Sequence, residues 1–150
     1  MLAGLLLLAV LATTVAAKAG IPLGGIPTIT IAPGVDLPMQ GLGTWLYNNS
    51  VAKASVLSAL ELGYVHIDTA LIYGNQVGVG QALKESGRDR KSYFITTKIP
   101  GGLNASFTQT SLEQDLTQLQ LSYVDLMLVH YPCTMDAKAA GESLLFFCFP

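Results

Sequence analysis

The sequence predicts an α/β fold, in which a parallel β-sheet is built from strands joined by crossover helices and is preceded by a β-hairpin. Two observations lead to this fold class. Strand-like and helix-like residue patterns alternate from about residue 40 to about residue 130, and such alternation is typical of a parallel sheet. The polar residues that end successive strands are about 30 residues apart, which is the length of one β-α-β unit.

The hairpin is expected over residues 28–39. The segments "TITIA" and "VDLPM" carry alternating apolar residues on either side of Pro33-Gly34, a dipeptide that favours a turn. The next segment, "QGLGTW" (40–45), is expected to be a short glycine-rich strand.

A helix and a strand follow. Residues 50–63 ("SVAKASVLSALELG") begin with a serine and end with a glycine, as helices often do. Their apolar face is expected to comprise Ala54, Leu57 and Leu60. The segment "YVHID" (64–68) is expected to be a strand, and Asn75 to cap a second helix that runs to about Ser86.

The same order is then repeated. The segment "SYFITTKI" (92–99) is rich in β-branched and aromatic residues, which favours a strand. Residues 108–121 are expected to form a helix that starts with a capping box of Thr110 and Glu113. Its apolar face is expected to comprise Leu112, Leu116 and Leu119. The last strand, "YVDLMLVH" (123–130), contains a continuous apolar run that is typical of a strand covered on both faces.

Composition narrows the classes of function. Hydrophobic residues make up 51% of the chain and charged residues 12%. The charged share is about half of the roughly 25% that is usual in globular domains. The formal net charge is -2 and no run of Lys or Arg occurs. Nucleic acid is therefore not expected as a partner.

Residues 1–19 ("MLAGLLLLAVLATTVAAKA") are expected to be a secretory signal peptide, because an apolar block is followed by the small residues of a cleavage site, "AKA". The block is shorter than the roughly 20 residues that a stable membrane span needs. It lacks a preceding Lys or Arg, so a buried helix or a misassigned start is the alternative. We therefore expect the secretory pathway or the extracellular space, with the cytoplasm as the alternative.

The two cysteines, Cys133 and Cys148, leave two alternatives open. They would form a disulfide in an oxidising compartment, or they are two free thiols. The sequence has no Cys-x-x-Cys pair and no His/Cys cluster, so no metal site is expected.

Three polar residues end successive predicted strands: Asp68, Lys98 and His130. Their separations are 98 − 68 = 30 and 130 − 98 = 32 residues. In a parallel barrel the carboxyl ends of all strands open onto one face, where reactive groups gather. Tyr73 follows Asp68 by five residues and is able to fold back over it from the loop. We expect these four side chains to share one mouth.

These residue types suit the protonation of an oxygen while a carbonyl is reduced. Lys98 beside Tyr73 would favour the phenolate and make Tyr73 a better proton donor, while Asp68 holds Lys98 in place. His130 would orient a substrate oxygen by a hydrogen bond. Each residue taken singly also has a structural alternative: a cap or turn former, a solvated strand end, a hydrogen-bonded histidine or a packed tyrosine. The regular spacing supports a shared site.

Four motifs closely resemble the aldo-keto reductase family in sequence, order and spacing: "GLGTW" (41–45), "HIDTALIYGN" (66–75), "ITTKIP" (95–100) and "YVDLMLVHYP" (123–132). The resemblance runs from about Ile29 to about Lys138. It implies a (β/α)8 barrel of the TIM type that reduces aldehydes or ketones to alcohols with NADPH.

By the same resemblance, the family's catalytic positions are taken by Asp68, Tyr73, Lys98 and His130, with Tyr73 as the general acid. Thr44 and Asp68 match positions that bind the cofactor near the nicotinamide ribose. Trp45 and His130 match positions that contact a small carbonyl substrate, and plain core packing is the alternative for Trp45.

The resemblance covers about the first four of the eight β/α units of such a barrel. We expect residues 20–138 to be a partial barrel and residues 139–150 to be a divergent apolar tail. The other half of the barrel carries most of the family's NADPH contacts, so we expect the reductase to be incomplete in this chain. The alternative is a non-catalytic half-barrel that pairs with a complementary half-barrel, or an incomplete gene product.

Overall fold

The structure, a computed structural model, describes residues 25–101, 105–131, 134–135 and 146–147. The expected signal peptide (1–19) lies outside the described residues. So do both cysteines and most of the expected apolar tail, so these predictions stay predictions.

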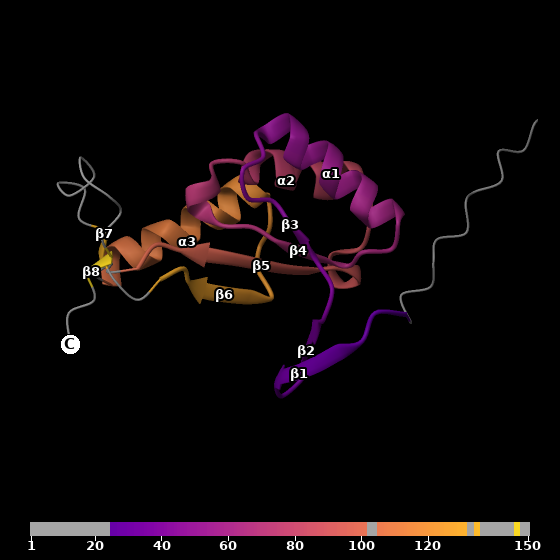
Figure 1. Ribbon diagram of the computed structural model, residues 1–150, viewed down its shortest axis with the longest axis horizontal. Helices are drawn as coiled ribbons and strands as arrows, with labels where there is room; N and C mark the ends of the chain where they lie inside the picture. The colour runs from indigo at the N-terminus through magenta and orange to yellow at the C-terminus, as the bar shows by residue number, and fades with distance from the viewer. Residues whose placement is uncertain (1–24, 102–104, 132–133, 136–145, 148–150) are drawn as a thin grey trace, which may run out of the picture.

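An antiparallel hairpin opens the described chain, as predicted. Strand β1 (Thr28–Ala32) pairs with β2 (Val35–Pro38). Between them Gly34 has a φ of +77°, a left-handed conformation that glycine adopts without a steric cost. Figure 1 shows the hairpin on the side of the molecule away from the helices.

Four parallel strands form one sheet in the order in which they occur in the sequence: β3 (Leu42–Gly43), β4 (His66–Asp68), β5 (Phe94–Ile99) and β6 (Leu126–Val129). This arrangement confirms the predicted α/β class and the preceding hairpin. The strands are shorter than the sequence suggested, and β3 has only two residues.

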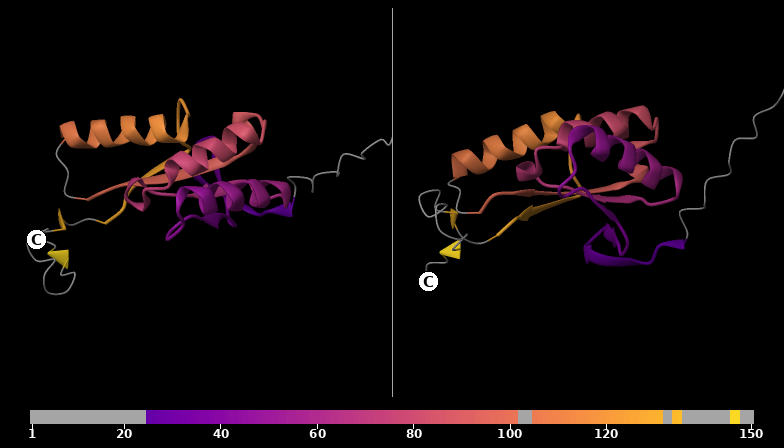
Figure 2. Two further views of the ribbon diagram at one scale, coloured as in Figure 1. Left: turned by 90° about the horizontal axis from the view of Figure 1, so that it is seen from above. Right: turned by 45° about the horizontal axis from the view of Figure 1, so that its top comes forward.

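Three α-helices lie on one face of this sheet (Figures 1 and 2): α1 (Asn49–Glu61), α2 (Gln76–Glu85) and α3 (Ala105–Leu119). Two 3₁₀ turns are η2 (Leu71–Tyr73) and η3 (Arg90–Ser92). A separate antiparallel pair, which the sequence did not predict, joins β7 (Thr134–Met135) and β8 (Phe146–Phe147). In the part of the chain that the structure describes, no helix is both long and apolar enough to cross a bilayer.

The core lies between the helices and the sheet. Ile67 of β4 and Ile95 of β5 are fully buried there, against side chains of all three helices: Ala52, Val56, Leu60, Val79, Ala82, Leu83 and Leu119. Successive residues of a strand point to opposite faces. Asp68 and Lys98 are one and three residues beyond these two isoleucines, so they lie on the face of the sheet away from the helices.

The buried face of α1 is only partly as predicted, because Leu60 is buried but Ala54 and Leu57 are not. Its buried residues are Ala52, Val56, Ala59 and Leu60, whereas Ala54 is exposed and Leu57 only partly buried. The observed spacing follows the period of about 3.6 residues better than the predicted steps of three. The helix also begins one residue early, because the side chain of Asn48 accepts a hydrogen bond from the backbone N–H of Val51 (2.9 Å).

Two glycines of α2 allow close helix packing. A Cβ atom at Gly78 would lie 2.1 Å from the backbone oxygen of Asn49, and one at Gly80 would lie 2.5 Å from that of Gln118. Asn75 precedes the helix as predicted, but its side chain makes no capping hydrogen bond. Its amide is used elsewhere, as described below.

The predicted capping box of the third helix is wrong. Helix α3 already includes Ala105, so Thr110 lies inside it and donates a hydrogen bond to the backbone oxygen of Ser106 (3.1 Å). A Thr-x-x-Glu spacing therefore occurs here within a helix rather than at its start. The apolar face is also only partly as predicted: Leu119 is buried but Leu112 is 36% exposed.

Strand β6 is not covered on both faces. In the described chain Leu128 is 38% and Val129 61% exposed. The strand pairs only with β5 and forms an edge of the four-stranded sheet. The continuous apolar run therefore predicted the strand correctly, but the prediction that both of its faces are covered was wrong for the described chain.

Candidate active site

The ends of three neighbouring strands bring the predicted polar residues together. Asp68 is the last residue of β4, Lys98 lies one residue before the end of β5, and His130 directly follows β6. The pairing continues to His130, whose backbone N–H donates to the oxygen of Ile99 (2.8 Å). These residues share the face of the sheet away from the helices.

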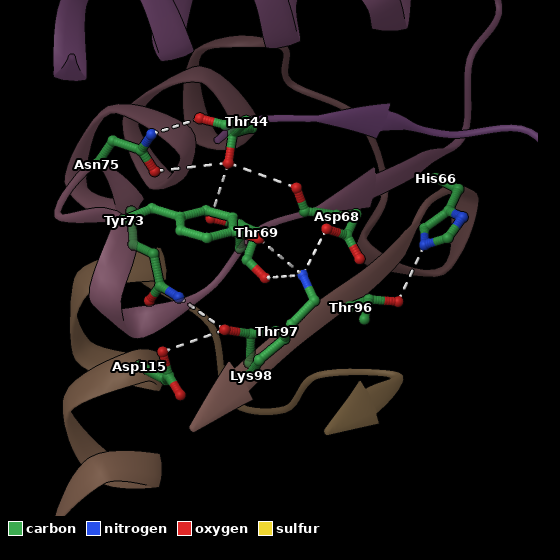
Figure 3. Close-up of polar contacts among 11 residues, drawn as sticks. Thr44, His66, Asp68, Thr69, Tyr73, Asn75, Thr96, Thr97, Lys98 and Asp115 are labelled. Atoms are coloured by element: carbon green, nitrogen blue, oxygen red, sulfur yellow. Dashed lines mark hydrogen bonds and ion pairs between the residues drawn. The ribbon is translucent and has the colours of Figure 1, made fainter. Parts of the chain in front are cut away.

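The ammonium group of Lys98 joins the site (Figure 3). Its Nζ lies 2.5 Å from Oδ1 of Asp68, 2.9 Å from the backbone oxygen of Thr69 and 3.4 Å from the hydroxyl of Tyr73. The lysine side chain is only 13% exposed and that of Asp68 35%. The three N–H bonds of the ammonium thus have three acceptors, which fixes its position.

Tyr73 approaches from a short turn rather than from a strand. It ends η2, and the next residue, Gly74, has a φ of +65° that terminates the turn. The tyrosine ring lies 5.6 Å from the ring of His130 at 72°, and 6.5 Å from the ring of Trp45 at 33°. The predicted folding back of Tyr73 over the strand end is therefore present.

The imidazole of His130 completes the group of four. Burial lowers the pKa of His130, the Lys98 charge lowers it further, and the Asp68 carboxylate acts in the opposite direction. The ring is therefore neutral at neutral pH. Its buried Nδ1 has no hydrogen-bond partner among the described residues, and a buried polar atom of this kind favours a ligand or water partner.

The two residues predicted to flank the site differ in exposure. Thr44 is fully buried, and its hydroxyl lies 3.0 Å from that of Thr69 and 3.4 Å from the backbone oxygen of Asp68. Trp45 is 66% exposed, which argues against plain core packing. Their contacts with cofactor and substrate stay predictions.

Two residues near the site were missed at the sequence level. Thr69 supplies the backbone oxygen that holds Lys98, and Asn75 is fully buried against the turn that carries Trp45. Backbone oxygens leave no sequence signal. Asn75 stood within the motif 66–75, but its position before a helix suggested only a cap.

His66 stands apart from this group. Its Nδ1 lies 3.1 Å from the backbone oxygen of Pro38 and its Nε2 2.9 Å from the hydroxyl of Thr96. Burial, the largest influence, lowers the pKa of His66, so a neutral ring donates to Pro38 and accepts from Thr96. It ties the hairpin to the sheet. The described part of the chain also holds no cluster of three or more His, Cys, Asp or Glu residues suited to a metal ion.

Comparison with known proteins agrees with this arrangement. The profile of the Aldo/keto reductase family matches residues 40–138. Among curated relatives, glycerol 2-dehydrogenase (NADP(+)) of Saccharomyces cerevisiae is 44% identical over 118 residues, which are 78% of this chain and 38% of that protein. Methylglyoxal reductase DkgB of Salmonella typhi is 46% identical over 109 residues, 72% of this chain and 41% of that protein.

Solved structures show the same likeness. An aldo/keto reductase from Brucella melitensis superposes with a TM-score of 0.67 at 40% identity, over 69% of this chain and 41% of that one. The Bombyx mori aldo-keto reductase AKR2E4, solved in complex with NADP, gives 0.69 at 31% identity, over 75% and 40%. The chain thus spans about 40% of the length of these relatives, and its parallel β/α units correspond to part of their TIM barrel. On the profile match and these identities, this chain belongs to the aldo/keto reductase family.

Proposed function

We propose that this site reduces the carbonyl group of a small aldehyde or ketone to an alcohol, with NADPH as the reductant. The observation that carries the proposal is the position of the Lys98 ammonium, between the Asp68 carboxylate and the Tyr73 hydroxyl, at 2.5 and 3.4 Å. A phenol next to a held positive charge is suited to give up a proton, because the ammonium stabilises the phenolate that remains.

The described residues fit one end of the cofactor. One carboxylate oxygen of Asp68 is bound to Lys98, while the other makes no hydrogen bond to the described residues and the side chain is 35% exposed. That oxygen is suited to accept from a ribose hydroxyl, and the hydroxyl of Thr44 lies 3.4 Å from the backbone oxygen of the same aspartate. We assign Asp68 and Thr44 to the nicotinamide ribose, and we assign none of the described residues to the cofactor's phosphates.

NADPH supplies a hydride to the carbonyl carbon. In our proposal Tyr73 gives its proton to the carbonyl oxygen, so the substrate gains one hydride and one proton and becomes an alcohol. The phenolate is stabilised by Lys98 until it takes up a proton from solvent. His130 is neutral and accepts or donates one hydrogen bond, which orients the carbonyl oxygen toward Tyr73.

The test is the replacement of Tyr73 by phenylalanine. NADPH oxidation is followed with methylglyoxal, which the name of one relative indicates as a substrate of that protein. Loss of a general acid is expected to lower turnover by about 10² to 10⁴-fold. Tyr64→Phe is the matched control, because Tyr64 lies before β4, at the opposite end of the strand from Asp68. Near-normal turnover in Tyr73→Phe would contradict the proposed role.

A second candidate is a half-barrel without catalytic activity that pairs with another chain. The exposed apolar residues of edge strand β6, Leu128 and Val129, favour it, because unpaired strand edges readily pair. Sedimentation of the purified chain tests this candidate. A monomer that oxidises NADPH in the presence of an aldehyde would exclude it.

A further inference from the structure

A four-residue turn follows β3 and carries Trp45 at the mouth of the site. It runs from Thr44 to Tyr47 and is closed by a hydrogen bond from the backbone N–H of Tyr47 to the oxygen of Thr44 (3.2 Å). Within it Leu46 has a φ of +66° and is 81% exposed. A left-handed leucine costs free energy, and its exposed side chain gains little from packing. Contacts elsewhere must therefore hold the turn.

Asn75 supplies these contacts. The residue is fully buried, and its Nδ2 donates to the backbone oxygens at both ends of the turn, Thr44 (2.7 Å) and Tyr47 (2.9 Å). Figure 3 shows the contact with Thr44. Its Oδ1 lies 3.5 Å from the hydroxyl of Thr44. Although Asn75 precedes α2, its side chain makes no hydrogen bond to that helix. Both polar atoms of its side chain contact the Thr44–Tyr47 turn.

Asn75 is also close in sequence to Tyr73, the proposed proton donor. Asn75 follows Tyr73 by two residues, across the left-handed Gly74. The ring of Trp45 lies 6.5 Å from the ring of Tyr73 although two thirds of the tryptophan is exposed. Packing alone does not hold an exposed ring in place, so the backbone of the turn determines where Trp45 stands.

We propose that Asn75 is a positioning residue for the substrate site: by binding both ends of the Thr44–Tyr47 turn it holds Trp45 beside Tyr73. Trp45 then forms a flat apolar wall next to the carbonyl position, and this wall favours carbonyl compounds with an aromatic or apolar substituent. The preference for apolar substrates rests on the proposed reductase function, whereas the role of Asn75 in holding the turn does not.

Fluorescence tests the turn directly, because Trp45 is the single tryptophan of the chain. Time-resolved anisotropy of the full chain is expected to show a ring that moves with the protein. In Asn75→Ala a fast local component is expected. In Asn75→Asp, which keeps the shape but loses both N–H donors, the same component is expected. Unchanged anisotropy in these folded variants would overturn the proposal.

Asn49→Ala is the matched control. Asn49 is a neighbouring asparagine that contacts the backbone of Gly74 (3.5 Å) and Gly78 (2.7 Å) but not the Thr44–Tyr47 turn. Its loss is expected to leave the Trp45 anisotropy unchanged. A fast component of equal size in Asn49→Ala would overturn the proposal. If the Asn75 variants do not fold, the wild-type measurement still decides, because a freely rotating Trp45 in the wild type contradicts a held turn.

Kinetics separate this inference from the proposed function. In Asn75→Ala, KM for benzaldehyde is expected to rise about tenfold, as for a lost apolar contact, with kcat and the KM for methylglyoxal little changed. A fall in kcat for both substrates with KM unchanged would contradict a positioning role for Trp45. Restricted Trp45 motion in a wild-type chain that reduces no aldehyde would contradict a reductase function of this chain alone and leave the role of Asn75 in the turn standing.

Discussion

Replacing Asp115 with asparagine is expected to stabilise the protein at neutral pH. Asp115 is fully buried where α3 packs on β5. Its Oδ1 accepts a hydrogen bond from the hydroxyl of Thr97 (3.2 Å), which in turn accepts one from Nε2 of Gln76 (2.6 Å) (Figure 3). Its Oδ2 has no partner among the described residues. Burial raises the pKa of Asp115, and the neighbouring polar groups of Gln76 and Thr97 oppose this only in part.

The magnitude follows from these contacts. An ionised Asp115 leaves a buried charged oxygen without a partner, at a cost of about 1 to 3 kcal/mol. Asparagine keeps the hydrogen bond from Thr97 and removes the charge, but it exchanges a charge-assisted bond for a neutral one that is worth about 1 kcal/mol less. Burial raises the pKa of this carboxyl in spite of its hydrogen bonds, so we expect a net gain, of up to about 2 kcal/mol. The midpoint of thermal unfolding should rise by about 2 to 4 °C for each kcal/mol gained.

The stability difference between Asp115→Asn and the wild type should depend on pH. A carboxyl whose pKa is higher in the folded protein than in the unfolded chain binds more protons when folded, so stability falls as the pH rises between the two values. The stability of Asp115→Asn minus that of the wild type should therefore be small below about pH 4. It should grow as the pH rises through the folded pKa and then stay constant.

Urea unfolding followed by circular dichroism at a series of pH values measures this difference. Asp89→Asn is the control, because the exposed carboxylate of Asp89 accepts from the backbone N–H of Lys91 (2.7 Å) at the start of η3. Asparagine replaces aspartate there with a change within about 0.5 kcal/mol. An Asp115→Asn variant less stable than the wild type at neutral pH, or a difference that does not grow with pH, would refute the reasoning.

Two other replacements should destabilise the fold. Gly78→Ala places a Cβ 2.1 Å from the backbone oxygen of Asn49, which forces α1 and α2 apart at a cost of about 1 to 3 kcal/mol. Asp125→Ala leaves Arg90 without its ion pair (2.6 Å) and the N–H of Ile95 without its acceptor (2.7 Å), at a cost of about 3 kcal/mol. Both costs are measured by urea unfolding.

Each of these has a matched control in the same chain. Gly43→Ala adds a Cβ with no atom within 4 Å and is expected to change stability by less than about 0.5 kcal/mol. Glu85→Ala breaks the pair with Lys53, whose N–O distance is also 2.6 Å but whose side chains are 35% and 57% exposed. That loss should cost less than about 1 kcal/mol. Equal costs for the two ion pairs would show that burial does not decide their strength.

Sequence patterns predicted the order of helices and strands better than they predicted which face of each element is buried. The order of hairpin, strands and helices is as expected, since turn residues and apolar runs are local signals. The buried face of α1 was only partly predicted because Ala52 and Ala59, which are buried, are weakly apolar and carry little signal. The burial of Asp115 was not predicted, because the hydrogen bonds that make it possible come from Thr97 and Gln76, which belong to other elements.

The convergence of Asp68, Lys98 and His130 was predictable because it follows from parallel pairing. Asp68 pairs with Thr96, so Lys98 lies two residues further along β5 and points to the same face. Lys98 pairs with Leu128, and His130 again lies two residues further along its strand. An even offset at each step keeps all three side chains on one face. Tyr73 and Trp45 do not follow from this rule, because turns place them, and the contacts that hold these turns come from residues distant in sequence. The strand ends therefore place the three polar residues, whereas the two aromatic residues depend on Gly74 and Asn75.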